Sequence, residues 1–216
     1  MTQRSSYKVG QIRRDNEAAI LAAAEEEFAE LGFSGAAIGR IAERAGVPRS
    51  NVHYYFSSKE ALYSRLLTDV VERWNEAFPE ITRDDDPATA LESYIRAKLE
   101  FSRQHARASK IFASEVLRGA PLLDDYLGSN TRDWLLGKTR VIEDWIAQGR
   151  MDPVDPRYLI FMIWSSTQHY ADFDAQVKLL IGQSELTHSD FDRVAETLTH
   201  IILKGCGLNS AAGGRA

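Results

Sequence analysis

Histidine and cysteine are the residue types in this chain most suited to metal binding or nucleophilic catalysis. Such chemistry needs fixed patterns, for example two histidines four positions apart on one helix, or a thiol beside a base. The single cysteine, Cys206, lies near a glycine-rich segment with no evident base, and the sequence has no glycine-rich phosphate loop. The histidines form no metal-spaced pair; they are His53, His105, His169, His188 and His200. The sequence therefore predicts a protein that is not an enzyme and has no metal or cofactor, with a helical enzyme as a remote alternative.

The elements that could position binding residues are helices throughout. Nearly every segment has the apolar period and length of an α-helix, and no strand pattern or fixed-period repeat stands out. We therefore expect an all-α fold. The expected helices cover about 15–32, 38–45, 49–55, 58–78, 88–105, 107–118, 121–127, 129–149, 157–181 and 188–204.

The short helices at 38–45 and 49–55 have the proportions of a helix-turn-helix. Gly46 between them permits the left-handed backbone of a tight turn, and Gly32 is a plausible end for the preceding helix. Ser57 and Glu60 have the spacing of a capping box that opens the next helix. Apolar side chains could pack this small unit against Phe28; they are Ile38, Ile41, Ala42, Val47 and Val52.

Length and charge divide the chain unevenly. The 216 residues, 44% of them apolar, are enough for a small reading module and a larger helical body. The net charge is −5, and residues 61–216 carry all of it, whereas residues 1–14 contain four basic residues and no acid. We expect a helix-turn-helix domain with a basic N-terminal arm at 1–57. A helical ligand-binding and dimerisation domain at 58–204 and a disordered tail at 205–216 follow.

The sequence indicates a cytoplasmic protein without membrane contact. A single cysteine allows no intrachain disulfide, which suits a reducing compartment. The N-terminus has no apolar signal-peptide core, and the longest strongly apolar run, Tyr158–Trp164, is far too short to span a bilayer.

A set of motifs over about thirty residues resembles the N-terminal domain of TetR-family regulators. The matching segments are Ile41-Ala42, Ala45-Gly46-Val47, Tyr54-Tyr55-Phe56 and residues 58–62. The resemblance implies a bacterial regulator, most often a repressor, that binds palindromic operator DNA as a homodimer. Dimers of such proteins bind two half-sites about one helical turn apart, or a multiple of it. In this family the last two long helices usually form the dimer interface, here 157–181 and 188–204.

The family's DNA contacts can be carried over to matching positions. Arg49, Ser50 and Asn51 would face the major groove, where arginine can read guanine and asparagine can read adenine. Pro48 stands where the family usually has a capping serine, and His53 where it usually has tyrosine. Tyr54 and Lys59 would contact phosphate, Lys59 together with a helix N-terminus.

Two basic positions and one departure qualify this assignment. Arg40 and Arg44 could be DNA contacts or only a solvated face. The family's threonine before the first short helix is here Ala36 or Ala37, which removes a cap and a phosphate contact.

Blocks in the C-terminal body resemble a narrower group in the same family, the regulators of pyrimidine utilisation. They are residues 94–100, 119–123, 159–164 and 166–173. This resemblance implies an effector such as uracil, thymine or a reduced derivative. A flat base of this kind fits aromatic stacking and a few placed polar groups. Gln168 offers both a donor and an acceptor, and Thr167 and Trp164 share its helix face; Trp74 and Lys98 could close the pocket.

Simpler roles compete with these. Trp164 could be plain core, Thr167 and Gln168 could make a polar contact across the dimer, and Lys98 could form a surface pair with Glu92 or Glu100. Within the regulator class, the main alternative effector is a fatty acid or a drug-like compound, which would need a long apolar tunnel or internal acids.

Overall fold

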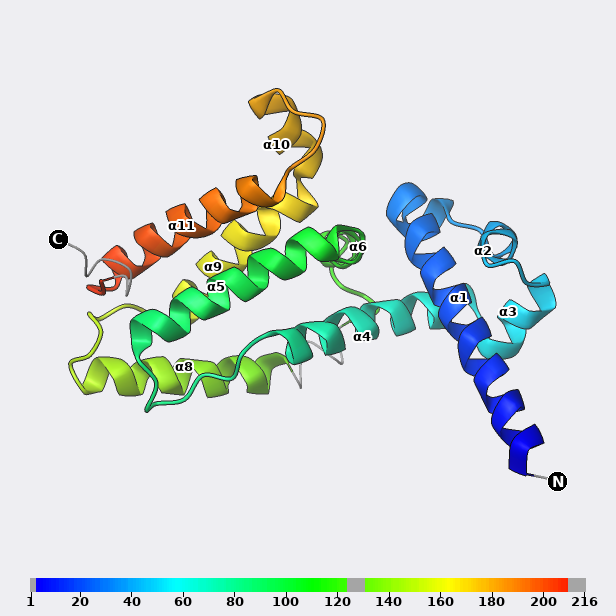
Figure 1. Cartoon of the computed structure of the whole chain (residues 1–216), viewed down its shortest axis with the longest axis horizontal. Coiled ribbons are helices and arrows are strands. Elements are labelled where there is room, and N and C mark those ends of the chain that lie inside the picture. Colours follow the sequence, from blue (N-terminus) through cyan, green and yellow to red (C-terminus); the bar gives the residue numbers. More distant parts are fainter. Residues whose placement is uncertain (1–2, 124–130, 210–216) are drawn as a thin grey trace. The chain divides into compact units, whose positions relative to one another are not determined.

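The regular elements of the described residues are all helices. The computed structural model describes residues 3–123 and 131–209, with side chains from residue 11 onward. Figure 1 shows these helices, and the expected all-α fold is confirmed for the described ranges. The chain divides into two compact units: residues 1–71 with 110–124, and residues 72–109 with 125–216.

The first unit begins with a long helix, α1 (Gln3–Gly35), interrupted at Gly32, where φ is 67°. The predicted end of the helix at this glycine is confirmed, because only glycine adopts this backbone conformation without strain. The helix starts earlier than the expected residue 15. Residues 3–14 contain no proline that would stop a helix, so the predicted basic arm continues α1.

Two short helices follow, α2 (Ile38–Arg44) and α3 (Arg49–Tyr55). Gly46 has a φ of 65°, and Val47 N donates to Ala42 O over 3.0 Å, which closes the predicted turn. The core of this unit includes most of the residues expected there. Phe28, Ile41, Ala42 and Val52 are buried, and Ile38 and Val47 are half-buried.

The helix α4 (Lys59–Ala77) carries the chain from the first unit into the second. Its cap differs from the prediction: Ser58 Oγ accepts a hydrogen bond from Ala61 N over 3.1 Å, so Ser58 and not Ser57 is the capping residue. Glu60 is therefore the second helical residue, and no Ser57–Glu60 capping box forms. The helix α6 (Ala106–Leu117) also passes between the two units in sequence.

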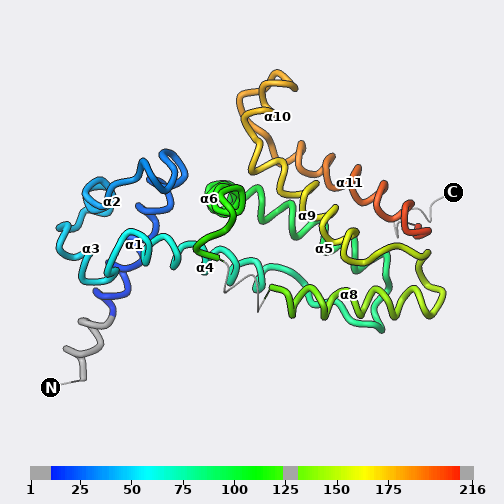
Figure 2. The backbone as a smooth tube through the Cα atoms, turned by 180° about the vertical axis from the view of Figure 1, so that it is seen from behind, coloured from blue at the N-terminus to red at the C-terminus, as the bar shows by residue number. Residues whose placement is uncertain are grey.

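The second unit contains α5 (Pro87–Gln104), α8 (Arg132–Ala147), α9 (Pro156–Asp172), α10 (Asp174–Ile181) and α11 (His188–Gly205). Aspartates cap α5 and α9, each followed by a proline that suits the first helical turn. Thr187 and Asp190 form a capping box at α11. Both Figure 1 and Figure 2 show α5 alongside α9 and α11, and α5 packs against each of these two helices.

Two expected helices are corrected. The segment 157–181 is not one helix, because Phe173 (φ −116°, ψ 29°) separates α9 from α10. Residues 121–123 form a turn, and the rest of the expected helix 121–127 lies outside the described residues.

A single apolar core holds the second unit together. Trp145 is fully buried in it beside Ile95 and Ile163, and its indole Nε1 donates to Arg83 O over 3.2 Å. Cys206 and Leu208, which fall in the segment predicted as a tail, are buried in the same core; residues 210–216 lie outside the described residues. No helix among the described residues is long and apolar enough to cross a membrane.

Candidate functional site

One face of α3 presents polar side chains to solvent. Arg49, Ser50, His53 and Tyr54 are exposed, Tyr54 by 72%, while Val52 faces inward and is fully buried. Asn51 is half-buried. Successive residues of an α-helix lie 100° apart, so positions 49, 50, 53 and 54 share one side. The helix therefore offers several donors along one exposed stripe.

The start of α3 depends on Pro48. This residue is the N-cap, with no side-chain hydrogen bond, and its carbonyl accepts from Asn51 N over 2.9 Å. Proline cannot supply the side-chain acceptor that serine supplies, so the first turn is stabilised by backbone alone. Pro48 therefore occupies the N-cap position of α3 but supplies no side-chain hydrogen bond there.

Two side chains predicted as possible DNA contacts, Lys59 and Arg40, have intramolecular partners. Lys59 Nζ donates to Phe33 O (2.8 Å) and Ala36 O (3.1 Å), which leaves one of its three N–H groups for another acceptor. Arg40 donates through Nε to Glu27 Oε1 (2.5 Å) and through Nη2 to Gly35 O (2.6 Å), with 49% of its side chain exposed. Arg44 is within ion-pair distance of three glutamates on α1.

Four of the five predicted effector residues come together in the second unit, around Lys98 on α5. Lys98 is 3% exposed, and its Nζ donates to Gln168 Oε1 over 3.2 Å. The same nitrogen lies 5.0 Å from the ring centre of Trp74 and 5.8 Å from that of Trp164. These distances are within cation–π range. The alternative of a surface ion pair for Lys98 is wrong, because Glu92 and Glu100 pair with Arg96 and Arg103.

The environment of Lys98 disfavours its charge. Burial lowers the pKa of Lys98 to about 7, and the nearby carboxylate of Asp172 only partly offsets this. Asp172 is itself engaged, since it accepts from Ser109 Oγ over 2.5 Å. A charged lysine has three N–H donors, and within the described residues its nitrogen makes one hydrogen bond. The site can therefore offer N–H groups to an acceptor brought by a ligand.

Thr167 does not join this cluster. It is fully buried, and its hydroxyl donates to Ile163 O over 2.7 Å, within its own helix. Bonds of this kind to the carbonyl four residues earlier are common for threonine in helices. Its position is explained by helix packing without a ligand.

The structure adds aromatic residues that sequence reasoning missed. Phe78 lies 4.9 Å from Lys98 Nζ, and the Tyr94 hydroxyl accepts from Trp164 Nε1 over 2.6 Å. Phe101 contacts both Trp74 and Phe78, with ring centres 5.9 and 6.1 Å apart. Helical spacing could have indicated these residues, because residues three or four positions apart lie on the same helix face. Phe78 is four positions after Trp74, Tyr94 is four before Lys98, and Phe101 is three after it.

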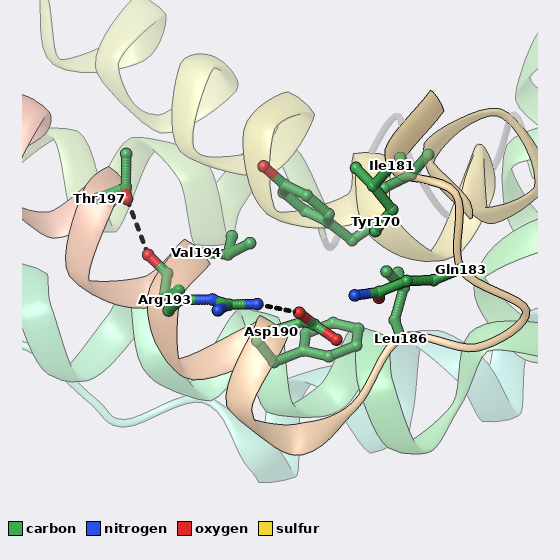
Figure 3. A pocket seen from close by; sticks show the side chains of 10 residues that line it. Tyr170, Ile181, Gln183, Leu186, Asp190, Arg193, Val194 and Thr197 are labelled. Atoms are coloured by element: carbon green, nitrogen blue, oxygen red, sulfur yellow. Dashed lines mark hydrogen bonds and ion pairs between the residues drawn. The ribbon is translucent and has the colours of Figure 1, made fainter. Parts of the chain in front are cut away.

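A separate pocket of about 280 Å³ lies among α9, α10 and α11 (Figure 3). Tyr170, Ile181 and Leu186 give it an apolar wall, and Arg193 forms an ion pair with Asp190 at its edge. None of the predicted effector residues lines this pocket. It is therefore distinct from the cluster around Lys98.

Comparison with known proteins decides the family. Residues 20–66 match the family model described as "Bacterial regulatory proteins, tetR family". Residues 67–209 match the model "YcdC-like protein, C-terminal region". The chain belongs to the TetR family. The N-terminal match covers the helix-turn-helix and the polar face of α3, so the family resemblance of these motifs is confirmed.

Individual relatives agree with this TetR assignment. The HTH-type transcriptional regulator RutR of Escherichia coli (strain K12) is 42% identical over 187 residues, covering 87% of this chain and 88% of that protein. RutR is the regulator that the C-terminal blocks resemble. The uncharacterised regulator YhgD of Bacillus subtilis is 25% identical, covering 90% and 98%.

Solved TetR-like structures share the fold. A tetR-family regulatory protein from Rhodococcus RHA1 has a TM-score of 0.72 at 20% identity, covering 90% of this chain and 98% of that one. AibR, solved with isovaleryl coenzyme A and operator DNA, has a TM-score of 0.68 at 15% identity, covering 86% and 97%. The chain is thus a TetR-type transcriptional regulator by family and fold.

Proposed function

We propose that this regulator represses transcription by binding palindromic operator DNA as a homodimer, and that a pyrimidine such as uracil or thymine releases it. The observation that carries the effector half is the gathering of Lys98, Gln168, Trp74 and Trp164 from three helices around one buried amine. The TetR family and the exposed face of α3 support the DNA half.

On the DNA side, the reading residues are Arg49, Ser50 and Asn51. Arg49 would donate two hydrogen bonds to guanine and Asn51 would pair with adenine. Tyr54, His53 and Lys59 would contact phosphate, and Arg40 would contribute a further cation. The exposed guanidinium of Arg49 and the half-buried amide of Asn51, both on one short helix, are the groups such readout needs.

On the effector side, the donors of Lys98 call for carbonyl acceptors. Uracil and thymine carry two carbonyls that flank one N–H, so a carbonyl can face Lys98 while the amide of Gln168 pairs with the imide edge. The rings of Trp74 and Trp164 can contact the flat base. Cytosine has an amino donor in place of one carbonyl. With its one carbonyl at Lys98, it would set its unprotonated ring nitrogen against Gln168 Oε1 and its amino group against Gln168 Nε2, because the bond from Lys98 fixes that amide. We therefore expect cytosine to be excluded.

The alternative effectors fit this surrounding less well. A cationic drug would meet the like charge of Lys98, and the carboxylate that acts on Lys98 among the described residues, Asp172, is already engaged by Ser109. A fatty acid needs a long apolar tunnel. The amine is instead surrounded by aromatic rings in mutual contact, including Phe78 and Phe101.

Exposed apolar residues support the homodimer. The helix α10 has no buried residue, although Leu179, Leu180 and Ile181 are 82%, 79% and 50% exposed. Large apolar side chains on α9 and α11 are also exposed, among them Phe161 and Ile201. A second copy is the partner that would cover these surfaces. In α11, Ile202 and Leu203 are buried within the chain, whereas their neighbour Ile201 is exposed and available to a partner.

The coupling would run along α4, which holds Trp74 in the second unit and begins at Lys59 in the first. An effector that binds one arrangement of the second unit more tightly shifts the population of distances between the two helix-turn-helix units of the dimer. A coupling free energy of about 1–3 kcal/mol would change DNA affinity by roughly 5- to 150-fold.

The test begins with duplexes selected by the protein from a random-sequence library. We expect a palindromic consensus, and we expect thymine to weaken binding of the selected duplex in fluorescence anisotropy. Binding without any consensus would contradict specific reading. An affinity unchanged by saturating uracil and thymine would contradict the effector, while the family assignment would stand.

A further inference from the structure

The first unit, which contains α3, has a buried carboxylate whose burial apolar packing does not explain. Glu27 is fully buried in α1, beside Phe28 and Ala24. Burying an unpaired carboxylate is costly, so its partners have to compensate for lost hydration. The position lies on the apolar stripe of α1, three residues after Ala24, where a leucine-sized side chain would pack without that cost.

Glu27 serves the start of α2. Its Oε1 accepts from Ala37 N over 3.3 Å, and Ala37 is the N-cap of α2, with an extended backbone and no side-chain acceptor of its own. The first N–H groups of a helix lack intrahelical partners, and a negative charge is favourable beside them. A carboxylate from α1 therefore partly replaces the cap that the alanines at 36 and 37 cannot provide.

The same carboxylate holds two arginines of α2. Oε1 accepts from Arg40 Nε over 2.5 Å, while Oε2 accepts no hydrogen bond and lies 3.3 Å from Arg44 Nε. Arg44 also binds Glu26 and Glu30 of α1, so it joins α2 to α1 and its guanidinium faces three carboxylates. Its role is that of a clamp.

Arg40 has a different surrounding. Glu27 and Gly35 O hold its Nε and Nη2, half of its side chain is exposed, and Nη1 has no partner among the described residues. A guanidinium fixed on one edge presents its other edge in a set direction. Such preorganisation lowers the entropic cost of a later contact.

We infer that Glu27 is a positioning residue for DNA binding: it orients Arg40 so that the free edge of the guanidinium binds a DNA phosphate, while Arg44 only clamps α2. This inference rests on the proposed DNA-binding function. The sequence left both arginines open as DNA contacts or as a solvated face. The inference makes Arg40 a DNA contact and Arg44 a structural contact between α1 and α2.

The test uses a fluorescein-labelled duplex of mixed sequence and the slope of log affinity against log salt. One phosphate contact contributes about 0.9 to that slope, so between about 50 and about 200 mM salt its loss removes roughly a threefold change in affinity. We expect Arg40→Gln to lower the slope by about one and Arg44→Gln to leave it unchanged. Glu27→Gln, which keeps the shape and one acceptor but loses the charge, should lower the slope as Arg40→Gln does. The double variant should show no further decrease.

A second variant separates positioning from folding. Adding Ala37→Ser to Glu27→Gln supplies a side-chain cap and should recover thermal stability. Because a hydroxyl at this position can itself contact phosphate, the reference is Ala37→Ser alone, and the double variant should have a slope about one lower than that reference. If Glu27→Gln keeps the parental slope while Arg40→Gln lowers it, or if the double variant has the slope of Ala37→Ser, the positioning role is overturned. An unchanged slope in Arg40→Gln also overturns it. The proposed function fails separately, if the parent protein binds no duplex.

Discussion

Lys98 Nζ on α5 donates to Gln168 Oε1 on α9 over 3.2 Å, at a place where only 3% of the lysine is exposed. One amide oxygen is a modest partner for a buried ammonium. Among the described residues the same nitrogen also lies over the rings of Trp74 and Phe78, and the carboxylate of Asp172 is nearby. We therefore expect this lysine to lower the stability of the fold, as is common where a site is prepared for a ligand.

The cost of burying Lys98 should be visible in stability. Because its folded pKa is about 7 and its ordinary value is 10.5, the unfolded chain holds the proton more tightly between these pH values. The penalty is full below about pH 7 and absent above about pH 10.5, so this group makes stability rise with pH across that window. Lys98→Met should raise the free energy of unfolding by about 1–3 kcal/mol near pH 6 and by much less near pH 10. Urea denaturation across this range checks it; a difference constant with pH would contradict it.

Effector affinity should depend on pH with the opposite sign. A carbonyl at Lys98 favours the charged amine, so binding raises its pKa and takes up a proton above about pH 7. The affinity for uracil should be flat below about pH 7 and fall above it, by at most about tenfold per pH unit. Calorimetry in buffers of different ionisation enthalpy measures the proton uptake. Affinity that rises with pH would rule out a charged Lys98 as the donor.

Operator reading should depend on α3. Arg49→Ala should lower affinity for a selected duplex by about 5- to 150-fold and relax the preference at one base pair, because a bidentate contact of about 1–3 kcal/mol is lost. Arg140→Ala is the control, since it removes an exposed arginine of α8 in the other unit. Equal losses in the two variants would mean that net charge, and not α3, determines binding.

The oligomeric state should respond to α10. Leu180 is 79% exposed on a helix with no buried residue, and placing a charge there should weaken a dimer that covers it. Sedimentation equilibrium of Leu180→Glu should show a shift toward monomer at concentrations where the parent is dimeric. Leu117→Glu is the matched control, because Leu117 is 81% exposed on α6. A parent protein that is monomeric, or a Leu180→Glu variant as dimeric as the parent, would contradict this interface.

Local signals predicted most of the fold. An aspartate followed by proline is a typical start of a helix, and it stands at the starts of α5 and α9. Gly32 and Gly46 lie at backbone turns that need positive φ. The break at Phe173 carries no such signal, since neither proline nor glycine stands beside it, and the apolar pattern continues across it. The bend between α9 and α10 is therefore visible in the structure but not in the sequence.

The candidate site was less readable from sequence. Glu92 and Glu100 stand near Lys98 in the sequence, so the sequence alone left a surface ion pair open for this lysine. The structure shows that these acids pair with Arg96 and Arg103 and that Lys98 is buried. Glu27 sits in a run of three glutamates that looks like a solvated face, yet it alone of the three is fully buried. Which member of a charged run turns inward depends on the helix it meets, here α2, and this is a tertiary property.

The pyrimidine site is tested most directly by calorimetric titration of the protein with uracil, thymine and dihydrouracil, with cytosine as the control ligand. We expect binding of at least one of the first three and none of cytosine. In Gln168→Ala we expect the affinity to fall by about 5- to 150-fold, because a buried hydrogen bond of about 1–3 kcal/mol is lost. Ser165→Ala, at an exposed position of the same helix, should bind as the parent does. No binding of any of the three, or equal binding of cytosine, would contradict a pyrimidine site at Lys98.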